Sequence, residues 1–166
     1  NKIERFIFAS SIYVFSEQGG VYRSTKQASE ILIENFKEEL GLNYTILRYG
    51  SLYGKRANNF NWIYKVINNI KRNMVITRES NGFEKRQYIN VEDAAFASIE
   101  ILDKKFKNKH VLLTGNKEFS IRQILNKIIK ISGKKVSVKY LNKTNLKDHY
   151  KNTPYTYTPR KGIKMQ

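Results

Sequence analysis

The amino-acid sequence predicts an α/β fold, in which short apolar strands alternate with amphipathic helices. A first apolar run at residues 6–10 is typical of a strand, and a second run, rich in β-branched and aromatic residues, spans 44–49. Between them, apolar residues recur with the 3.6-residue period of a helix as far as Leu40. In parallel sheets of this class, ligands lie outside the carboxyl ends of the strands.

The start of the first helix can be placed in two ways. Ser24 and Gln27 have the spacing of a capping box, which would leave Tyr22 outside the helix. Residues 15–20 contain three polar residues and end in two glycines, which is typical of a loop. We expect the helix to begin before Ser24, so that it includes Tyr22, and to end at Gly41, a suitable C-terminal cap.

The rest of the chain continues the alternation. Helices are predicted at 60–73, from the segment near 91 to about 102, and from Ser120, whose capping box includes Gln123, to Gly133. Strands are predicted at 74–77, 110–114 and 136–141, with a turn at 81–82 and a polar segment from 142 onward. In the second helix the residues expected to face inward are Phe60, Ile63, Ile67 and Ile70.

Composition restricts the classes of function. The 166 residues suffice for one domain, and the absence of Cys with only two His makes a metal site unexpected. No apolar run reaches the length of a membrane span, so we expect a cytoplasmic protein without a membrane partner. Lys and Arg number 31 against 14 acidic residues, but they are spread along the chain. We interpret them as a lysine-rich surface and not as a nucleic-acid site.

Polar residues near the start of the chain form a candidate catalytic group. Ser10 and Ser11 end the first strand, and Lys26 follows Tyr22 by four residues, which places both on one face of a helix. A nearby cation favours the phenolate form of a tyrosine, which would then act as a general base. Taken alone, the pair is explained equally well by a core tyrosine and a solvated lysine, because the chain has 11 Tyr and is rich in Lys.

The order of strand, paired serines and Tyr-x-x-x-Lys resembles the extended short-chain dehydrogenase/reductase family, the nucleotide-sugar epimerases and dehydratases. The resemblance implies a Rossmann-like parallel sheet with a small substrate-binding subdomain. It also implies that Ser11, Tyr22 and Lys26 are the catalytic triad, and that Ser10, Tyr22 and Lys26 bind the cofactor, NAD or NADP. In that mechanism Tyr22 removes a hydroxyl proton while hydride passes to the nicotinamide, and Lys26 holds the ribose.

Two further segments resemble motifs of the family. Arg48-Tyr49-Gly50-Ser51 is similar to Arg-Tyr-x-Asn-x-x-Gly, which implies that Tyr49 and Gly50 lie beside the cofactor. Ser11 and Ser51, the latter in place of the family's Asn, would contact the substrate. Residues 85–95 are similar to Arg-Asp-Tyr/Phe-x-x-Val-x-Asp-x-Ala, which implies that Arg86 binds the nucleotide diphosphate. A guanidinium fork suits phosphate oxygens.

The resemblance covers the chain from Arg5 to about residue 142. It implies that residues 1–166 form a partial NAD-dependent epimerase/dehydratase domain, with 1–56 as the catalytic Rossmann half and 57–166 as the end of the Rossmann sheet and the substrate-binding part. No G-x-G-x-x-G motif is present, so we expect the family's pyrophosphate-binding element to lie upstream. Ser11 and Tyr22 are eleven positions apart, where the family has a longer loop.

The predicted partner is a nucleotide-linked sugar, and a homodimer is a further candidate assembly. Dehydratases of the family carry an acidic pair where Ile12-Tyr13 follow Ser11, so epimerase or reductase activity is favoured over dehydration. The alternative is a catalytically inactive family member that senses nucleotides, or a fragment without function.

Overall fold

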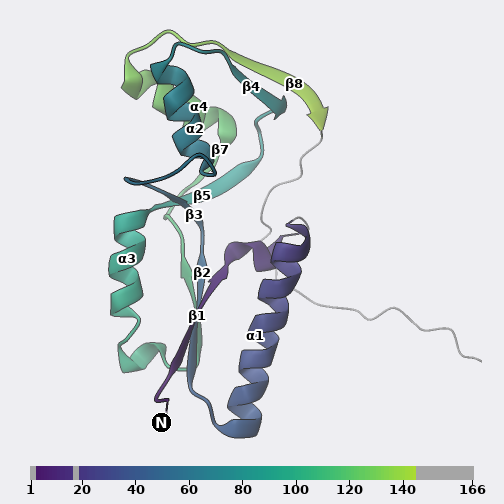
Figure 1. Cartoon of the computed structure of the whole chain (residues 1–166), viewed down its shortest axis with the longest axis vertical. Helices are drawn as coiled ribbons and strands as arrows, with labels where there is room; N and C mark the ends of the chain where they lie inside the picture. The colour runs from purple at the N-terminus through teal and green to yellow at the C-terminus, as the bar shows by residue number, and fades with distance from the viewer. Residues whose placement is uncertain (1–2, 17–18, 145–166) are drawn as a thin grey trace, which may run out of the picture.

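The lower part of the molecule is a three-stranded parallel sheet covered by a helix on each face (Figure 1). The structure is a computed structural model that describes residues 3–16 and 19–144. Strands β1 (Phe6–Ser11), β2 (Tyr44–Tyr49) and β6 (Lys109–Leu113) lie in the order β1-β2-β6. Ser11 pairs with Tyr49, so β1 and β2 end at the same edge. The predicted α/β fold with a parallel sheet is confirmed.

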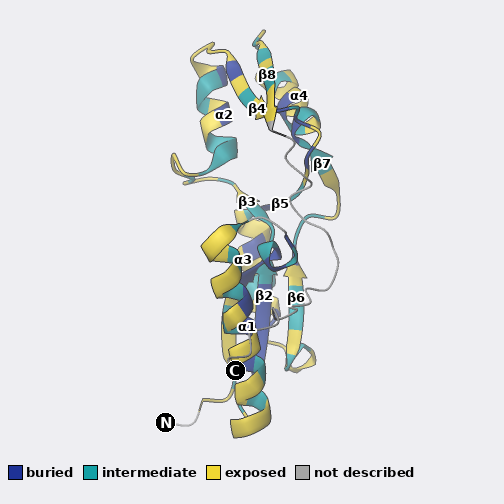
Figure 2. Ribbon diagram, turned by 90° about the vertical axis from the view of Figure 1, so that its right-hand side faces the viewer, coloured by how far each residue is buried: buried dark blue, intermediate teal, exposed yellow. Residues whose placement is uncertain are grey.

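Helix α1 (Gly20–Leu40) covers one face of this sheet and α3 (Val91–Glu100) covers the other (Figure 1). Two short 3-10 helices, η1 (Ile12–Phe15) and η2 (Lys104–Phe106), precede α1 and β6. Figure 2 shows β2 buried between the two helices. We call β1, β2, β6, α1 and α3 the sheet lobe; its buried residues are Ile33, Tyr44 and Ile46 toward α1, and Leu47, Ala94, Ile101 and Leu113 toward α3, where Ile89 of the neighbouring strand β5 (Lys85–Asn90) joins them.

The second part of the molecule, the distal lobe, consists of two helices and two parallel strands. These are α2 (Trp62–Lys71), α4 (Ile121–Ser132), β4 (Ile76–Ser80) and β8 (Val138–Thr144). In the described part of the chain, the buried cluster of this lobe consists of Val66, Ile70, Ile76, Ile121 and Leu125, and the partly buried Trp62 and Tyr140 pack against it. The predicted capping box of Ser120 and Gln123 is confirmed, as is the end of the helix at Gly133.

A short central sheet joins the two lobes. Strand β5 (Lys85–Asn90) pairs in parallel with β3 (Ser51–Tyr53) and antiparallel with β7 (Glu118–Ser120). The chain passes from β2 to β3 through Gly50, whose amide donates to the Leu113 carbonyl at 2.9 Å. A Cβ at this position would lie 3.1 Å from the Gln87 carbonyl oxygen, so glycine permits this close approach. The distal lobe therefore sits above the carboxyl ends of β1 and β2 (Figure 1).

The first helix begins where we expected and not at the alternative capping box. Helix α1 starts at Gly20, after Gly19 in a left-handed conformation, and therefore includes Tyr22. The Ser24 hydroxyl donates to the Gly20 carbonyl at 3.2 Å and caps nothing. The helix ends at Gly41, which is left-handed as predicted.

The second predicted helix and the strand after it begin later than the sequence pattern indicates. Asn61 caps α2 by accepting a hydrogen bond from the Tyr64 amide at 3.1 Å, so Phe60 lies outside the helix and is 94% exposed. The inward positions predicted for Phe60 and Ile67 are wrong, since Ile67 is exposed and its neighbour Val66 is buried instead; Ile70 is buried as predicted. The strand predicted at 74–77 is β4, and the last predicted strand, at 136–141, is β8. No helix in the described part of the chain is long and apolar enough to cross a membrane.

Candidate active site

The end of β1 places Ser11 beside the start of α1. Ser11 is buried, and its Oγ accepts a hydrogen bond from the Tyr13 amide at 3.2 Å, which caps η1. The Tyr13 ring then packs edge-on against the ring of Tyr22, with 5.9 Å between the ring centroids. The turn through η1 therefore brings the first turn of α1 close to the carboxyl end of β1.

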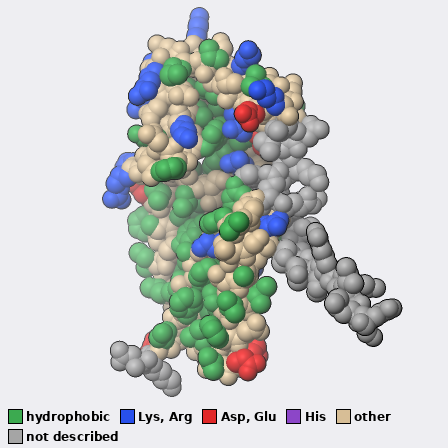
Figure 3. Space-filling model, turned by 45° about the vertical axis from the view of Figure 1, so that its right-hand side comes forward, with side chains coloured by type: hydrophobic (Ala, Val, Ile, Leu, Met, Phe, Trp, Pro, Cys, Tyr) green, Lys and Arg blue, Asp and Glu red, His purple; other side chains and the backbone are tan. Residues whose placement is uncertain are grey.

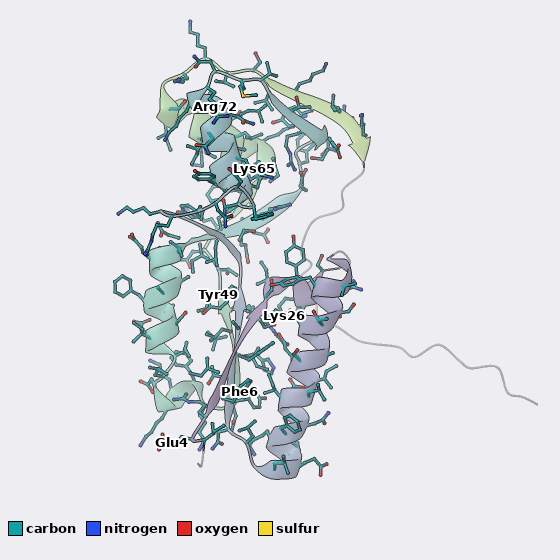
Figure 4. The ribbon with its side chains drawn as sticks, viewed as in Figure 1. Glu4, Phe6, Lys26, Tyr49, Lys65 and Arg72 are labelled. Atoms are coloured by element: carbon teal, nitrogen blue, oxygen red, sulfur yellow. The ribbon has the colours of Figure 1, made fainter. Side chains whose placement is uncertain are left out.

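Tyr22 and Lys26 lie on one face of α1, as their spacing predicts. The Lys26 Nζ lies 5.8 Å from the centroid of the Tyr22 ring and 4.8 Å from that of Phe8. It donates a hydrogen bond of 2.7 Å to the Ala9 carbonyl of β1. Figure 4 shows Lys26 between α1 and β1, near the carboxyl end of the strand. Tyr22 is 50% exposed, so its ring is accessible from this edge of the sheet.

Ser10 faces the interface between the sheet and α1. Its hydroxyl donates to the Glu30 carboxylate, which also accepts from the Arg48 Nη2 at 2.6 Å and Nε at 3.1 Å. The guanidinium of Arg48 lies 4.7 Å from the centroid of the Phe15 ring. A cavity of about 300 Å³ adjoins this ion pair. In this structure the Ser10 hydroxyl is thus engaged inside the protein, and its predicted contact with the cofactor stays a prediction.

The buried face of α1 is polar as well as apolar, which the sequence pattern did not indicate. The buried residues of the helix are Gln27, Glu30 and Ile33, spaced by three. The side-chain amide of Gln27 donates a hydrogen bond of 2.8 Å to the Val14 carbonyl and so links α1 to η1. The apolar residues that led us to predict the helix lie mostly on its exposed side, namely Ala28, Ile31, Leu32, Phe36 and Leu40.

The last residue of β2 and the two residues after it are three of the predicted site residues, Tyr49, Gly50 and Ser51. The Tyr49 hydroxyl lies 2.6 Å from the Ser98 Oγ, so its ring points toward α3 (Figure 4). Its backbone and that of Gly50 form the carboxyl end of β2, next to Ser11 of β1. Ser51 begins β3 and pairs with Tyr88 of β5. The roles of Tyr49 and Gly50 at the cofactor, and of Ser51 at the substrate, stay predictions.

Arg86 differs from the other arginine of this region in its pairing. It lies on β5 opposite Phe119 and is half-buried, and its Nε is buried with no hydrogen-bond partner among the described residues. Arg78 is paired: its Nη2 lies 2.8 Å from Oε1 of the buried Glu84. A guanidinium that lacks a carboxylate partner within the described residues suits an anionic ligand.

The Glu84 carboxylate accepts hydrogen bonds from two side chains. Besides Arg78, the Ser80 hydroxyl donates to the same carboxylate oxygen at 2.6 Å. Burial by itself raises the pKa of Glu84, but the hydrogen bonds from Ser80 and Arg78 outweigh burial and leave the pKa below its ordinary value. No sequence signal pointed to this buried group, because Glu84 stands in a polar turn.

The comparison with known families decides the class of protein. The profile of the NAD dependent epimerase/dehydratase family matches residues 1–115. The chain belongs to this family. The family that the sequence motifs resembled is therefore confirmed, and its description names NAD, the first of the two predicted cofactors.

The chain matches only part of the length of its curated relatives. An uncharacterised UDP-glucose epimerase of Bacillus subtilis is 24% identical over 156 residues, which cover 86% of this chain and 49% of the relative. A UDP-glucuronate 4-epimerase of Thermodesulfobacterium geofontis is 29% identical over 122 residues, 73% of this chain and 38% of the relative. The chain thus spans half or less of the length of these relatives.

Solved structures share the fold. The UDP-N-acetylglucosamine 4-epimerase of Methanobrevibacter ruminantium, in complex with UDP-N-acetylmuramic acid, superimposes with a TM-score of 0.77 at 24% identity, covering 89% of this chain and 53% of that one. The UDP-glucuronic acid 4-epimerase of Bacillus cereus, in complex with UDP-glucuronic acid and NAD, gives 0.76 at 22% identity, covering 90% and 51%. At these identities the likeness concerns the fold.

Proposed function

We propose that this chain is the substrate-side half of an NAD-dependent epimerase that acts on a nucleotide-linked sugar. The observation that carries the proposal is the placement of Tyr22 and Lys26 on one face of α1, beside Ser11 at the carboxyl end of β1. The relatives named as UDP-glucose and UDP-glucuronate epimerases support the substrate class.

In the proposed mechanism Tyr22 is the general base. The half-exposed Tyr22 side chain would act as its phenolate, with the Lys26 ammonium beside the ring; this phenolate would take the proton of the reacting sugar hydroxyl and become a neutral phenol. Because the Ser11 oxygen already accepts a hydrogen bond from the Tyr13 amide, the proton of its own hydroxyl remains for donation to the sugar oxygen. Ser11 would thus orient the reacting oxygen.

The residues at this edge fit one end of NAD. An ammonium, a phenol and the backbone of Tyr49 and Gly50 are suitable partners for the hydroxyls of a ribose and for the nicotinamide, and we assign Lys26 and Tyr22 to the ribose. When bound, NAD supplies the hydride acceptor for oxidation of the sugar. The chain has no G-x-G-x-x-G motif, so its residues fit the nicotinamide-ribose end and not the pyrophosphate.

Arg86 is the proposed ligand of the nucleotide diphosphate. Its buried Nε has no partner among the described residues, and β5 carries it in the central sheet above the end of β2. A formal charge of +17 also favours an anionic ligand. The proposal therefore places the sugar at Tyr22 and the diphosphate toward the distal lobe.

The experiment that tests this function is an epimerisation assay on the whole enzyme that contains this chain. The enzyme is incubated with NAD and, separately, UDP-glucose, UDP-N-acetylglucosamine and UDP-glucuronate, and the sugars are followed by proton NMR. We expect at least one to convert to its 4-epimer, and the reaction to run from either epimer. A 4-keto-6-deoxy product would contradict the epimerase assignment and indicate a dehydratase.

A further inference from the structure

Helices α2 and α4 leave an apolar groove open between them on the distal lobe. The groove has a volume of about 380 Å³, and four isoleucines line it: Ile67 and Ile70 from α2, and Ile128 and Ile131 from α4. Ile70 belongs to the core of the lobe, whereas Ile67 is 37% and Ile131 is 86% exposed. The floor of the groove therefore continues the core, while its rim is open to solvent.

The spacing of the lining residues fits a further helix. The lining positions are Ile67, Ile70 and Lys71 on α2, and Ile128, Ile131 and Ser132 on α4. Both sets have the spacing i, i+3, i+4, so each forms one continuous ridge on its helix. Two such ridges accept the ridge of a third helix between them. An amphipathic helix with apolar residues at i, i+3 or i+4, and i+7 would fill the groove.

The charge around the groove is positive. Helices α2 and α4, which the structure describes completely, contain no acidic residue, whereas α1 and α3 each carry several. Lys71 and Lys134 line the groove itself. On the face drawn in Figure 3, most Lys and Arg side chains lie on the distal lobe. Electrostatic complementarity therefore requires an occupant whose polar side is acidic.

The two lysines lie where both helices end. Helix α2 ends at Lys71, and the Lys134 Nζ, just after the end of α4, donates to the Lys71 carbonyl at 2.6 Å. The partial negative charge of a helix C-terminus by itself favours lysine at such positions. It does not explain the exposed Ile131, because an aliphatic side chain gains nothing from the helix dipole.

We propose that the groove between α2 and α4 is a docking site for an amphipathic helix of a separate protein. The apolar side of that helix lies against the four isoleucines, and its acidic first turn lies beside Lys71 and Lys134. Acidic residues are favoured in the first turn of a helix, so one orientation satisfies both helix dipoles and side-chain charges. The proposal depends on no catalytic assignment.

Two other occupants fit the groove less well. A symmetric pair of chains joined through it would bring Lys71 and Lys134 of one copy close to the same lysines of the other, and like charges repel. An anionic membrane would meet the lysines, but a bilayer surface does not enter a groove, so Ile70 at its floor would stay uncovered.

A designed peptide tests the docking site on the whole enzyme that contains this chain. The probe has about sixteen residues, Glu in its first turn, Leu at the helical period and a fluorescent label at its C-terminus. We expect saturable one-to-one binding by fluorescence anisotropy, with a dissociation constant of about 100 µM or less. A peptide of the same composition whose Leu residues break the period should bind at least about tenfold more weakly. Equal binding of the two peptides, or no binding, would overturn the proposal.

Matched variants locate the binding. Ile131→Asp and Lys71→Glu should each weaken binding of the Glu peptide about tenfold, whereas Lys65→Glu, at an exposed position of α2 outside the groove, should change it less than about threefold. Lys71→Glu should regain affinity for a peptide with Lys in its first turn, because the exchange restores opposite charges. Equal losses for Lys65→Glu and Lys71→Glu would mean that general electrostatics, and not this groove, holds the peptide.

Two measurements identify the other occupants. Co-sedimentation of the enzyme with vesicles of phosphatidylglycerol and phosphatidylcholine, without binding of the Glu peptide, would overturn the proposal in favour of an anionic membrane. Analytical ultracentrifugation of the wild type and of Ile131→Asp tests the second copy. We expect the same oligomeric state for both, and dissociation caused by Ile131→Asp would show that the groove is an interface between copies of this chain.

Discussion

Arg86 and Arg78 are close in sequence, yet the structure gives them different surroundings. Arg78 pairs with the buried Glu84, whereas Arg86 is half-buried and has no carboxylate partner among the described residues; the Nε atoms of both are buried without a hydrogen-bond partner there. If Arg86 binds the diphosphate, its loss removes charge-assisted hydrogen bonds. Arg86→Ala should then cost about 1.5–3 kcal/mol and weaken binding of the nucleotide-sugar by roughly tenfold to a hundredfold, measured by calorimetry on the whole enzyme.

Two matched variants make this prediction specific. Arg72→Ala removes an exposed charge at the end of α2 and should leave the affinity nearly unchanged. Arg86→Lys should restore only part of the affinity, because an ammonium lacks the planar fork of a guanidinium. Equal losses for Arg72→Ala and Arg86→Ala would mean that general electrostatics, and not a site, holds the anion. Arg78→Ala is unsuitable as a control because it would leave Glu84 buried and unpaired.

At the scale of single elements, the loop between β4 and β5 carries a pH-dependent contribution to stability. The pKa of Glu84 is lowered in the folded protein, so its ion pair stabilises the fold above the ordinary carboxyl pKa and is lost as the pH falls through the folded pKa. Glu84→Gln should therefore be less stable than the wild type at pH 7, and the difference should shrink as the pH falls below about 4.

Urea unfolding followed by the fluorescence of Trp62 measures this effect. Trp62 is the chain's single tryptophan, and its ring lies 5.2 Å from the Arg78 guanidinium in the distal lobe. Ile131→Gln, at an exposed site on α4, is a control whose stability difference from the wild type should not depend on pH. A gap between Glu84→Gln and the wild type that stays constant from pH 7 to pH 3 would contradict the account of this ion pair.

The elements that the sequence predicted well are those whose signals are local. The capping box of Ser120 and Gln123 and the cap at Gly133 are contacts between near neighbours, and both are present in the structure. The start of α2 was predicted too early because Phe60 continues the apolar period of the helix. The true N-cap, Asn61, gives only a weak sequence signal.

Contacts between distant residues could not be predicted in the same way. Glu30 meets Ser10 and Arg48, which come from two different strands, and Arg78 and Glu84 meet across a turn. At the candidate site, the helix period correctly placed Tyr22 and Lys26 on one face, but the hydrogen bond from Lys26 to the Ala9 carbonyl depends on what lies beside β1. No sequence pattern within α1 indicates what lies beside β1.

In the proposed function, the whole molecule supplies one side of the cofactor site. The edge formed by β1, β2 and α1 is proposed to bind the nicotinamide and its ribose, while the chain contains no glycine-rich motif for the pyrophosphate. The isolated 166-residue chain should therefore bind NAD weakly or not at all. Isothermal titration calorimetry of the isolated chain with NAD tests this prediction. A dissociation constant for NAD in the micromolar range would contradict the account.

The central claim is that Tyr22 transfers the proton in the whole enzyme, and one substitution tests it most directly. Tyr22→Phe removes the phenolic hydroxyl and keeps the ring that packs against Tyr13. The measurement is turnover of the nucleotide-sugar by the whole enzyme, with NAD affinity as the control. We expect kcat to fall by about two orders of magnitude or more while NAD affinity changes little. Turnover within a few-fold of the wild type would show that Tyr22 is a packing residue and that the catalytic assignment is wrong.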